Sequence, residues 1–391
     1  MMDQDKVATT LRLLGDLVGF PSVSVDGNRD VTEYLAKSLQ DAGARFWTEA
    51  DATGTKLNLF ATIGPDAPGG VILSGHTDVV PVADQPWSTD PFTMVKRDGR
   101  LYGRGTCDMK GFVAACVAMA PEFARADLKV PVHFAFTYDE EIGCFGAQAL
   151  TASLAARGLR PAAAIIGEPS MMQLVDGHKG CFEYTTWITG REGHGSAPDL
   201  GVNAVEYGAR FIGKLVELRG RLKAMAPSDC PFDPPHSTIN PGTLIGGQAH
   251  NVIPGKARID WEMRPIQAGD ADFVKAELAK LVETLLPEMR AVDPGADIRT
   301  DIVAEVAGLE RVAQNPARDL VARLTGANAA GLVPFGTEAG LFQAIGIPSV
   351  ICGPGSIAQA HKPDEYLDVD QLEQCLAFLS RLVGRLERGP V

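Results

Sequence analysis

The sequence predicts an α/β domain with a mostly parallel sheet, interrupted by a smaller inserted α+β domain. In residues 1–177 and again in 308–391, short apolar runs alternate with segments of helical periodicity. This alternation is typical of a sheet that helices cover on both faces. In residues 178–307, apolar and polar residues alternate within the strand-like runs, as in antiparallel strands with one solvated face.

The first domain begins with two segments of helical periodicity, and the first of them ends at Pro21. Strand-like apolar runs and further helices then alternate up to the inserted domain. After it, a helix, a strand and a closing helix return to the same pattern. The expected helices cover residues 6–20, 31–43, 109–124, 146–158, 317–327 and 368–387, and the expected strands cover residues 58–64, 70–80, 130–141, 161–170 and 346–355.

The inserted domain has its own order of elements. A strand is followed by a helix, two strands, a second helix and a last strand, which is the βαββαβ order of ferredoxin-like domains. The expected strands cover residues 179–190, 237–247, 256–265 and 297–306, and the expected helices cover residues 203–222 and 270–286.

The composition limits the classes of function. Of the 391 residues, 45% are hydrophobic and 22% are charged, as in soluble globular proteins. A formal net charge of -13 argues against nucleic acid or an anionic membrane as a partner. No apolar run is long enough to span a bilayer, and the acidic, amphipathic start favours the cytosol over secretion. Seven cysteines without CxxC spacing predict reduced thiols.

Histidine and carboxylate side chains follow the strand-like runs of the first domain. In "SGHTDVVP", His76 and Asp78 come at the end of an apolar run and share one face of an extended chain. A carboxylate beside an imidazole can fix its tautomer and leave the other ring nitrogen free for a metal. A surface loop would also accommodate such a pair, so this motif indicates a metal site only together with the other motifs described below.

The stretch "TYDEEIG" places Asp139, Glu140 and Glu141 side by side where a buried strand ends. Their mutual repulsion is unfavourable unless positive charge lies among them. With a divalent cation there, one carboxylate can ligate it while its neighbour stays free as a proton acceptor. Gly143 permits the turn that would let both approach one centre. The alternative is a solvated acidic loop.

Three more candidate ligands lie in loops or at the end of a strand-like run. Asp108 follows a Gly-rich turn that matches no nucleotide-binding pattern, and a helix N-cap is its alternative role. Glu168 ends an apolar run in "GEPS", and His361 lies in a loop rich in Gly and Pro. Nothing in the sequence marks a base for Cys107, so an inert thiol is expected. Mixed His and carboxylate donors suit Zn²⁺, Co²⁺ or Mn²⁺, and a shared carboxylate suits a two-metal hydrolytic centre.

With these motifs the chain resembles the family of acetylornithine deacetylase and succinyl-diaminopimelate desuccinylase. These are metallohydrolases with paired ions, related to zinc aminopeptidases and carboxypeptidases. The resemblance spans essentially the whole chain and rests on "SGHTDVVP", "GRGTCDMKG", "DEEIGCFGA", "GEPS" and "AHKPDEY" in this order. Residues 336–366 resemble the acetylornithine deacetylase branch of this family more than the desuccinylase branch. The resemblance implies a zinc-exopeptidase-like catalytic domain and an inserted domain that serves as lid and dimerisation domain.

The resemblance also implies how two divalent ions are held, expected to be Zn²⁺ with Co²⁺ able to substitute. Asp108 would bridge the two ions and be followed by a cis peptide bond. His76 and Glu168 would complete one site, and Glu141 and His361 would complete the other.

Further roles come from the same resemblance. Asp78 would orient the histidine two residues before it, and Glu140 would act as general base on the attacking water. His194 would reach the active site of a partner subunit and stabilise the oxyanion, although the residue pattern alone indicates a loop histidine. Arg264 would bind a substrate carboxylate, unless it forms a structural salt bridge. Weaker candidates for substrate contacts are His250, Asn251 and Glu338, the last of which has a structural hydrogen bond as its alternative.

The expected reaction is removal of the acetyl group from N2-acetyl-L-ornithine in arginine biosynthesis, by a cytoplasmic homodimer. Alternatives with the same chemistry are succinyl-diaminopimelate, another N-acyl amino acid or a dipeptide as substrate. A nucleotide-dependent oxidoreductase is disfavoured because the glycine fingerprint is absent. A catalytically inactive metal-binding or scaffold homologue is disfavoured because every matched position carries the expected residue.

Overall fold

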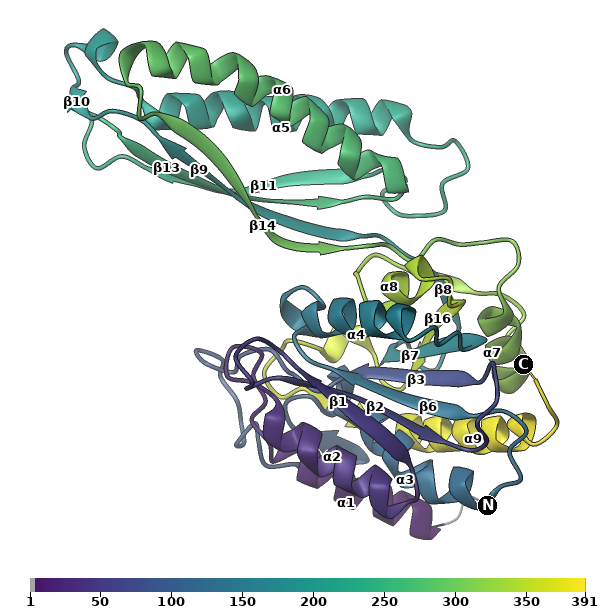
Figure 1. Cartoon of the computed structure of the whole chain (residues 1–391). Helices are drawn as coiled ribbons and strands as arrows, with labels where there is room; N and C mark the ends of the chain where they lie inside the picture. Colours follow the sequence, from purple (N-terminus) through teal and green to yellow (C-terminus); the bar gives the residue numbers. More distant parts are fainter. Residues whose placement is uncertain (1–3, 391) are drawn as a thin grey trace. The chain divides into compact units, whose positions relative to one another are not determined.

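The computed structural model describes residues 4–390, and the chain divides into two compact units (Figure 1). Unit 1 comprises the chain up to Gly177, Arg311–Leu332 and the chain from Thr337 onward. Unit 2 comprises His178–Glu310 and the short segment Val333–Gly336. Each unit has its own hydrophobic core.

A mixed sheet forms the centre of unit 1, with the strand order β1-β2-β6-β3-β7-β16-β8-β15. The central strands β6, β3, β7 and β16 run parallel, as predicted, whereas β1, β2 and β8 are antiparallel to their neighbours. Every residue of the four central strands is buried, which explains their continuous apolar runs. The strands are β1 (Arg45–Ala50), β2 (Leu57–Ile63), β3 (Val71–His76), β6 (Val132–Thr137), β7 (Ala163–Pro169), β8 (Val175–His178), β15 (Gly331–Val333) and β16 (Ser349–Gly353).

Helices cover both faces of this sheet (Figure 1). On one face α2 and α3 contact the strands, and α1 and α9 pack against α3. On the other face α4 contacts β2 and β6, and α8 contacts β7 and β16. The helices are α1 (Gln4–Val18), α2 (Arg29–Asp41), α3 (Gly111–Arg125), α4 (Phe145–Ala156), α7 (Pro316–Thr325), α8 (Ala339–Ala344) and α9 (Val369–Leu386).

In unit 1 the sequence analysis does not predict the short helix α8, the strands β1, β8 and β15 near the edges of the main sheet, or the strands of a small separate sheet. Strand β1 lies at the sheet edge and is largely exposed, so its residues lack the apolar pattern of a buried strand. A separate small sheet has the order β17-β5-β4, with three residues in each strand. Strands this short are too brief to show a hydrophobic period. Their bounds are β4 (Val95–Arg97), β5 (Arg100–Tyr102) and β17 (Tyr366–Asp368).

Unit 2 contains an antiparallel sheet with the strand order β11-β13-β9-β14. Helices α5 and α6 lie on one of its faces (Figure 1). The order along the chain is the βαββαβ order that the sequence predicts. Its main elements are β9 (Cys181–Thr189), α5 (Ala204–Met225), β11 (Thr238–Gly246), β13 (Lys256–Arg264), α6 (Ala268–Val292) and β14 (Asp297–Val306), with β10 (Gly193–His194) and β12 (Val252–Ile253) as a separate pair.

All seven cysteines are free, and five of them are buried. None of the helices within residues 4–390 combines the length and the apolar character that crossing a membrane requires.

Gly167 allows helix α3 to pack closely on β7. A Cβ atom at Gly167 would lie 2.0 Å from the ring of Phe112. We expect Gly167→Ala to lower the free energy of unfolding by about 1–3 kcal/mol, because the buried ring has to shift. Gly384→Ala in α9 is the matched control, since a Cβ there meets nothing within 4 Å, and it should stabilise by about 0.5–1 kcal/mol. Urea unfolding of both variants measures the difference, and equal stabilities would contradict the packing argument.

Candidate metal centre

The carboxyl ends of three parallel strands bring acidic side chains and a histidine to one edge of the unit 1 sheet. His76 is the last residue of β3, and Glu168 is next to last in β7. Strand β6 lies beside β3 and ends at Thr137, just before the acidic stretch. Open α/β sheets bind their ligands at this edge.

His76, Asp108 and Glu168 form a first group whose ligand atoms all lie within 4.8 Å of one another. His76 Nε2 is 3.0 Å from Asp108 Oδ1 and 3.6 Å from Glu168 Oε1. All three side chains are buried, and no residue within 4–390 donates a hydrogen bond to Glu168 Oε1. A buried carboxylate oxygen without a donor is unfavourable unless a cation neutralises it.

Asp108, Glu141 and His361 form a second group of the same size. His361 Nε2 lies 2.9 Å from Glu141 Oε2 and 3.4 Å from Asp108 Oδ2. Asp108 thus turns Oδ1 toward the first group and Oδ2 toward the second. The Glu141 side chain is 5% exposed and that of His361 is 52% exposed, so the second group opens to solvent.

The three adjacent carboxylates of "TYDEEIG" have different surroundings. After β6 the chain turns at Asp139, whose φ is 55°, and Glu140–Ile142 form one turn of 3₁₀-helix before Gly143 at φ 133°. Asp139 turns to Lys56, whose Nζ lies 2.7 Å and 2.5 Å from its two oxygens. Glu141 joins the second group, whereas Glu140 belongs to neither group. The turn therefore separates the adjacent charges.

Asp78 supports this loop more directly than it orients His76. His76 Nδ1 lies 2.9 Å from the backbone oxygen of Asp78 but 3.6 Å from its carboxylate. That carboxylate instead accepts hydrogen bonds from the backbone N–H groups of Glu140 at 3.2 Å and Glu141 at 3.4 Å, and from Ser24 Oγ at 2.7 Å. Asp78 thus joins the His76 strand to the loop of the two glutamates.

A buried carboxylate that the sequence analysis does not single out holds the backbone before Asp108. Glu365 accepts N–H groups from Gly105, Cys107 and Asp108 at 2.8–3.1 Å, and Arg104 Nη1 at 2.8 Å. The Asp108–Met109 peptide bond is cis, as the family resemblance implies. The signal for Glu365 is its place in "AHKPDEY", four residues after His361, but a loop rich in Gly and Pro suggests a solvated side chain.

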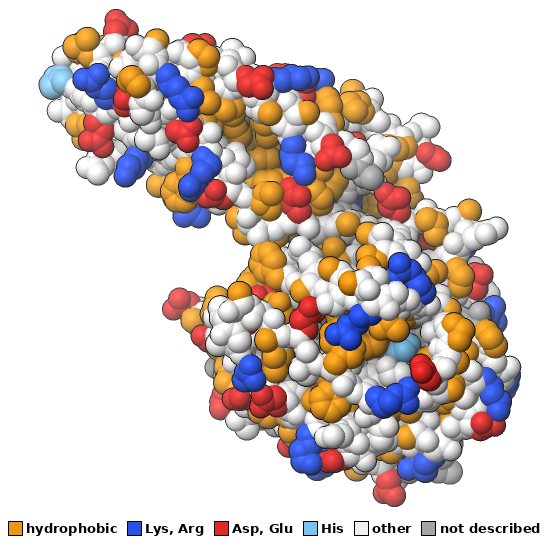
Figure 2. Space-filling view, viewed as in Figure 1, with side chains coloured by type: hydrophobic (Ala, Val, Ile, Leu, Met, Phe, Trp, Pro, Cys, Tyr) orange, Lys and Arg blue, Asp and Glu red, His pale blue; other side chains and the backbone are white. Residues whose placement is uncertain are grey.

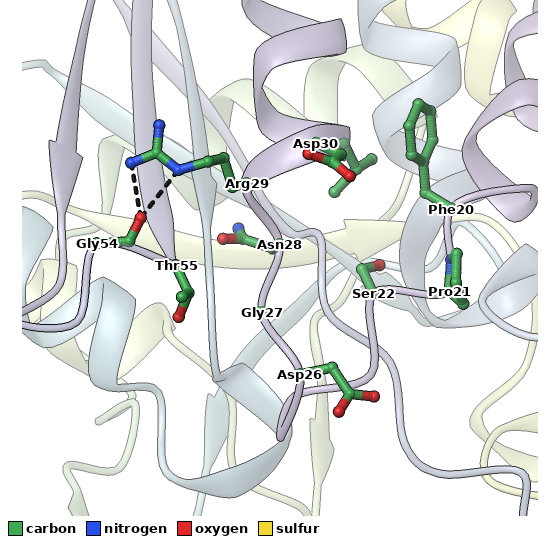
Figure 3. Close-up of a pocket in the computed structure, with 11 residues that line it drawn as sticks. Phe20, Pro21, Ser22, Asp26, Gly27, Asn28, Arg29, Asp30, Gly54 and Thr55 are labelled. Carbon is green, nitrogen blue, oxygen red and sulfur yellow. Dashed lines mark hydrogen bonds between the residues drawn. The ribbon is translucent and has the colours of Figure 1, made fainter.

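A pocket of about 350 Å³ is lined by residues between Phe20 and Val31 and by Gly54 and Thr55 (Figure 3), and part of this lining contacts the segment that links His76 to Asp78. Two residues of its lining support Thr77, which stands between the pair. Ser22 Oγ donates to the Thr77 backbone oxygen at 2.6 Å, and Asn28 Nδ2 donates to Thr77 Oγ1 at 2.7 Å. The segment that contains Ser22 and Asn28 therefore holds the backbone next to His76 in place.

The charges of the centre show a shortage of positive charge. Burial raises the pKa of Glu168 well above its usual range, and burial and the charge of Asp108 raise that of Glu141 to about 7. Burial also opposes the ionisation of Asp108, but hydrogen bonds from His361 and His76 outweigh it and lower its pKa. Hydrogen bonds to Asp108 and Glu141 raise the pKa of His361 to about 10. Without a cation, Glu141, Glu168 and His361 therefore hold protons that reduce the negative charge of the centre.

These donor atoms fit divalent cations of the Zn²⁺ type. Imidazole nitrogens mixed with carboxylate oxygens suit Zn²⁺, Co²⁺ and Mn²⁺, and one carboxylate shared between two groups suits a pair of ions. The unpartnered Glu168 oxygen and the raised carboxyl pKa values independently indicate that the residues are arranged for positive charge. The structure brings together all five predicted ligands, His76, Asp108, Glu141, Glu168 and His361.

Glu338 contacts the ends of β3 and β6 at the same sheet edge, and only 1% of its surface is exposed. It accepts hydrogen bonds from the hydroxyl groups of Thr137 and Ser74, the latter at 3.1 Å. A side chain so enclosed fits the alternative of a structural hydrogen bond better than a contact with substrate.

The other predicted substrate residues lie in unit 2. His194 in β10 pairs with Val252 in β12, and the Gly195 N–H donates to the Asn251 oxygen at 2.7 Å, so these two predicted residues belong to adjoining loops. His250 precedes Asn251 and is exposed. Arg264 ends β13 and forms an ion pair with Glu262 at 2.7 Å, which is the structural role that the sequence analysis gives as its alternative.

The model of the peptidase family M20/M25/M40 matches residues 72–385 of the chain. The chain is 33% identical to an acetylornithine deacetylase of Photorhabdus laumondii over 385 residues, 97% of each protein. It is 35% identical to an acetylornithine deacetylase of Shigella sonnei over 372 residues, 93% of this chain and 94% of the relative. A crystal structure of an M20 family metallo-carboxypeptidase from Sulfolobus solfataricus superposes with a TM-score of 0.77 at 18% identity, covering 99% and 100% of the two chains.

Protein freed of metal with a chelator should lose stability as the pH rises. Because their pKa values are raised to about 7 and about 10, Glu141 and His361 hold more protons in the folded state than in the unfolded chain between pH 4.5 and 10. In the pH range tested, this effect should exceed the opposite one of Lys110, whose pKa burial lowers to about 7. Melting temperatures from about pH 5.5 to about pH 8.5 should therefore fall, and added Zn²⁺ should raise them more at the higher pH. A melting temperature that stays level without metal, or a Zn²⁺ effect that is larger at low pH, would contradict this balance of charge.

Proposed function

The chain belongs to the peptidase family M20/M25/M40, and we propose that it removes the acetyl group from N2-acetyl-L-ornithine, giving L-ornithine and acetate for arginine biosynthesis. Membership makes it a metal-dependent hydrolase of amide bonds. The observation that carries the choice of substrate is the 33–35% identity to acetylornithine deacetylases over nearly the whole length of both proteins. The similarity of residues 336–366 to that branch supports the same choice.

We propose that two divalent ions, Zn²⁺ with Co²⁺ able to substitute, are bound by His76, Asp108 and Glu168 and by Asp108, Glu141 and His361. When bound, such ions lower the pKa of a water molecule and polarise the amide oxygen. The division of the Asp108 oxygens between the two groups supports its role as the shared ligand.

Glu140 is proposed as the general base. It is adjacent to Glu141 but outside both groups of ligands, so its carboxylate is free to exchange a proton. Burial raises its pKa well above the usual range, with the charges of Glu141 and Asp108 acting in the same direction. A base with a raised pKa can take a proton from water and return it to the departing amine. Asp78 fixes the backbone N–H of Glu140 and so positions this base.

Arg264 and His194 are proposed to bind the substrate from unit 2. The planar guanidinium of Arg264 suits the substrate α-carboxylate, which would share or replace its contact with Glu262. His194 Nδ1 accepts the Ser196 N–H at 3.2 Å, so the neutral imidazole carries its proton on Nε2 and can donate it to an oxyanion.

The positions of these two residues within unit 2 support a homodimer. His194 pairs with β12, just before β13 begins, whereas Arg264 is the last residue of β13. The nine residues of that strand span about 27 Å at roughly 3.4 Å per residue. One small substrate cannot contact both residues of the same copy, so a second copy would supply the histidine.

Hydrolysis of a panel of substrates, measured as the release of a free amino group from each, tests the proposed function. With Zn²⁺ or Co²⁺ bound, kcat/KM should be highest for N2-acetyl-L-ornithine, and lower for succinyl-diaminopimelate, other acetylated amino acids and dipeptides. Glu140→Gln should keep its bound metal, measured by elemental analysis, but lose turnover by a factor of about 10²–10⁴. A higher kcat/KM for another substrate would replace acetylornithine, and an active Glu140→Gln enzyme would refute the proposed base. A wild-type protein that binds metal but hydrolyses nothing on the panel would be the inactive homologue.

Mixing two inactive variants tests the exchange of His194. Copies with Glu140→Gln and copies with His194→Ala, dissociated and reassociated together, should regain roughly a quarter of wild-type activity, because half the dimers are hybrids with one complete site of two. Each variant reassociated alone provides the baseline. Mixtures that stay at the baseline, although native mass spectrometry detects hybrid dimers, would place the histidine in its own subunit's site or outside catalysis.

A further inference from the structure

A second cavity of unit 1, of about 560 Å³, lies at the end of the sheet opposite the metal centre. Strand β6 shows the separation, since His133 lines the cavity near its start and Thr137 ends it beside the acidic loop. The four steps along the chain from one to the other correspond to about 13 Å of extended strand. The cavity is therefore distinct from the site of the proposed hydrolysis, and its volume lies within the range of small-molecule pockets.

Aromatic rings form one wall of this cavity. Trp47, Phe60 and His133 come from the neighbouring strands β1, β2 and β6 and stack in a row, with ring centroids 5.5 Å and 5.2 Å apart and interplanar angles of 27° and 26°. Phe46 also lines the cavity and is 39% exposed. The remaining apolar lining consists largely of rigid prolines, namely Pro65, Pro68, Pro131 and Pro161. Such a wall offers ring edges and proline rings as an apolar surface that a ligand does not have to order.

Positive charge around the cavity lacks carboxylate partners. Arg45 and Arg160 line it, and the guanidinium of Arg157 covers the Trp47 ring at 4.2 Å. Arg45 donates a hydrogen bond to the backbone oxygen of Gly64, and Arg160 donates one to the backbone oxygen of Leu159. Within residues 4–390, none of the three arginines forms an ion pair.

The chain has 49 acidic and 36 basic residues, and some arginines elsewhere in unit 1, such as Arg100 and Arg104, contact a carboxylate. Others, such as Arg323, form no ion pair in the part of the chain that the structure describes, so what distinguishes Arg45 and Arg160 is their place in the lining of this cavity. One acidic residue, Asp66, lines the cavity as well, but no ion pair joins it to these arginines. In the space-filling view, hydrophobic, basic and acidic side chains lie together around one histidine on the visible face of unit 1 (Figure 2).

We propose that this cavity is a second binding site, for a planar aromatic ligand that carries an anionic group such as a carboxylate, phosphate or sulfonate. The ring lies against the edges of the Trp47, Phe60 and His133 rings and against the prolines, where edge-to-face contact and apolar burial hold it. The anionic group meets the guanidinium forks of Arg45 and Arg160, which suit planar or multidentate oxyanions. Neither a neutral ring nor a bare anion satisfies both parts of the site.

Isothermal titration calorimetry of the metal-loaded full chain with 2-naphthalenesulfonate tests this proposal, because a sulfonate is a poor ligand for divalent metals. One site per chain is expected, with affinity at least about tenfold higher than for methanesulfonate, which lacks the ring, or for 2-naphthol, which lacks the charge. Arg45→Ala and Arg160→Ala should each weaken binding about tenfold, whereas Arg323→Ala, an exposed arginine of α7, should leave it unchanged.

Two outcomes would overturn the proposal. One is affinity equal to that of methanesulfonate or 2-naphthol, and the other is unchanged affinity in both Arg45→Ala and Arg160→Ala. The site is independent of the proposed hydrolysis, so the probe should bind the Glu140→Gln protein with unchanged affinity. Displacement of the probe by N2-acetyl-L-ornithine would assign it to the hydrolytic site instead and refute a second site.

Discussion

The arrangement of unit 1 depends on a set of buried carboxylates that the protein itself does not neutralise. Asp108, Glu140, Glu141 and Glu168 approach one another at the edge of an otherwise apolar sheet, and the nearby positive charge comes from two imidazoles. Such a cluster is unfavourable in isolation, so the fold has to hold its members in place. Buried strands, a left-handed turn and the backbone contacts of Asp78 provide that support. The same support makes the centre selective for cations, because the ligands cannot move apart to relieve their repulsion.

Much of this could be predicted from the sequence because strand ends and ligands coincide. The buried strands β3, β6 and β7 show as apolar runs, and His76, Glu141 and Glu168 follow or end them, so the sheet edge could be assembled without coordinates. Asp108 and His361 lie in loops, and the assignment of all five residues as ligands depended on the family resemblance. The βαββαβ order of unit 2 also followed from the alternation of its residues. Patterns that reflect burial on a regular element are readable in this way.

The rest depends on contacts between distant loops, which leave no local pattern. The sequence around Glu365 predicts a surface residue, and nothing near Arg104 predicts burial. In the structure the two side chains form an ion pair, and both are buried. The division of labour among Asp139, Glu140 and Glu141 depends on Lys56, 83 residues before the first of them. Strands β1, β4, β5 and β17 are short or exposed, so their pairing partners define them rather than their own residues. Glu338 shows the converse, since a family-like motif suggested a substrate contact and burial favours a structural role.

Glu365 has a consequence for how this region can change. Its carboxylate belongs to the loop of His361 but holds the backbone that precedes Asp108, so the loops on both sides of the second group are tied together. Arg104 neutralises that carboxylate from the Asp108 side. A loop transplanted from a relative into positions 354–366 would therefore have to bring a compatible partner at position 104. The two segments therefore form one structural unit, although Gly105, whose N–H donates, and Glu365, which accepts, are 260 positions apart in the sequence.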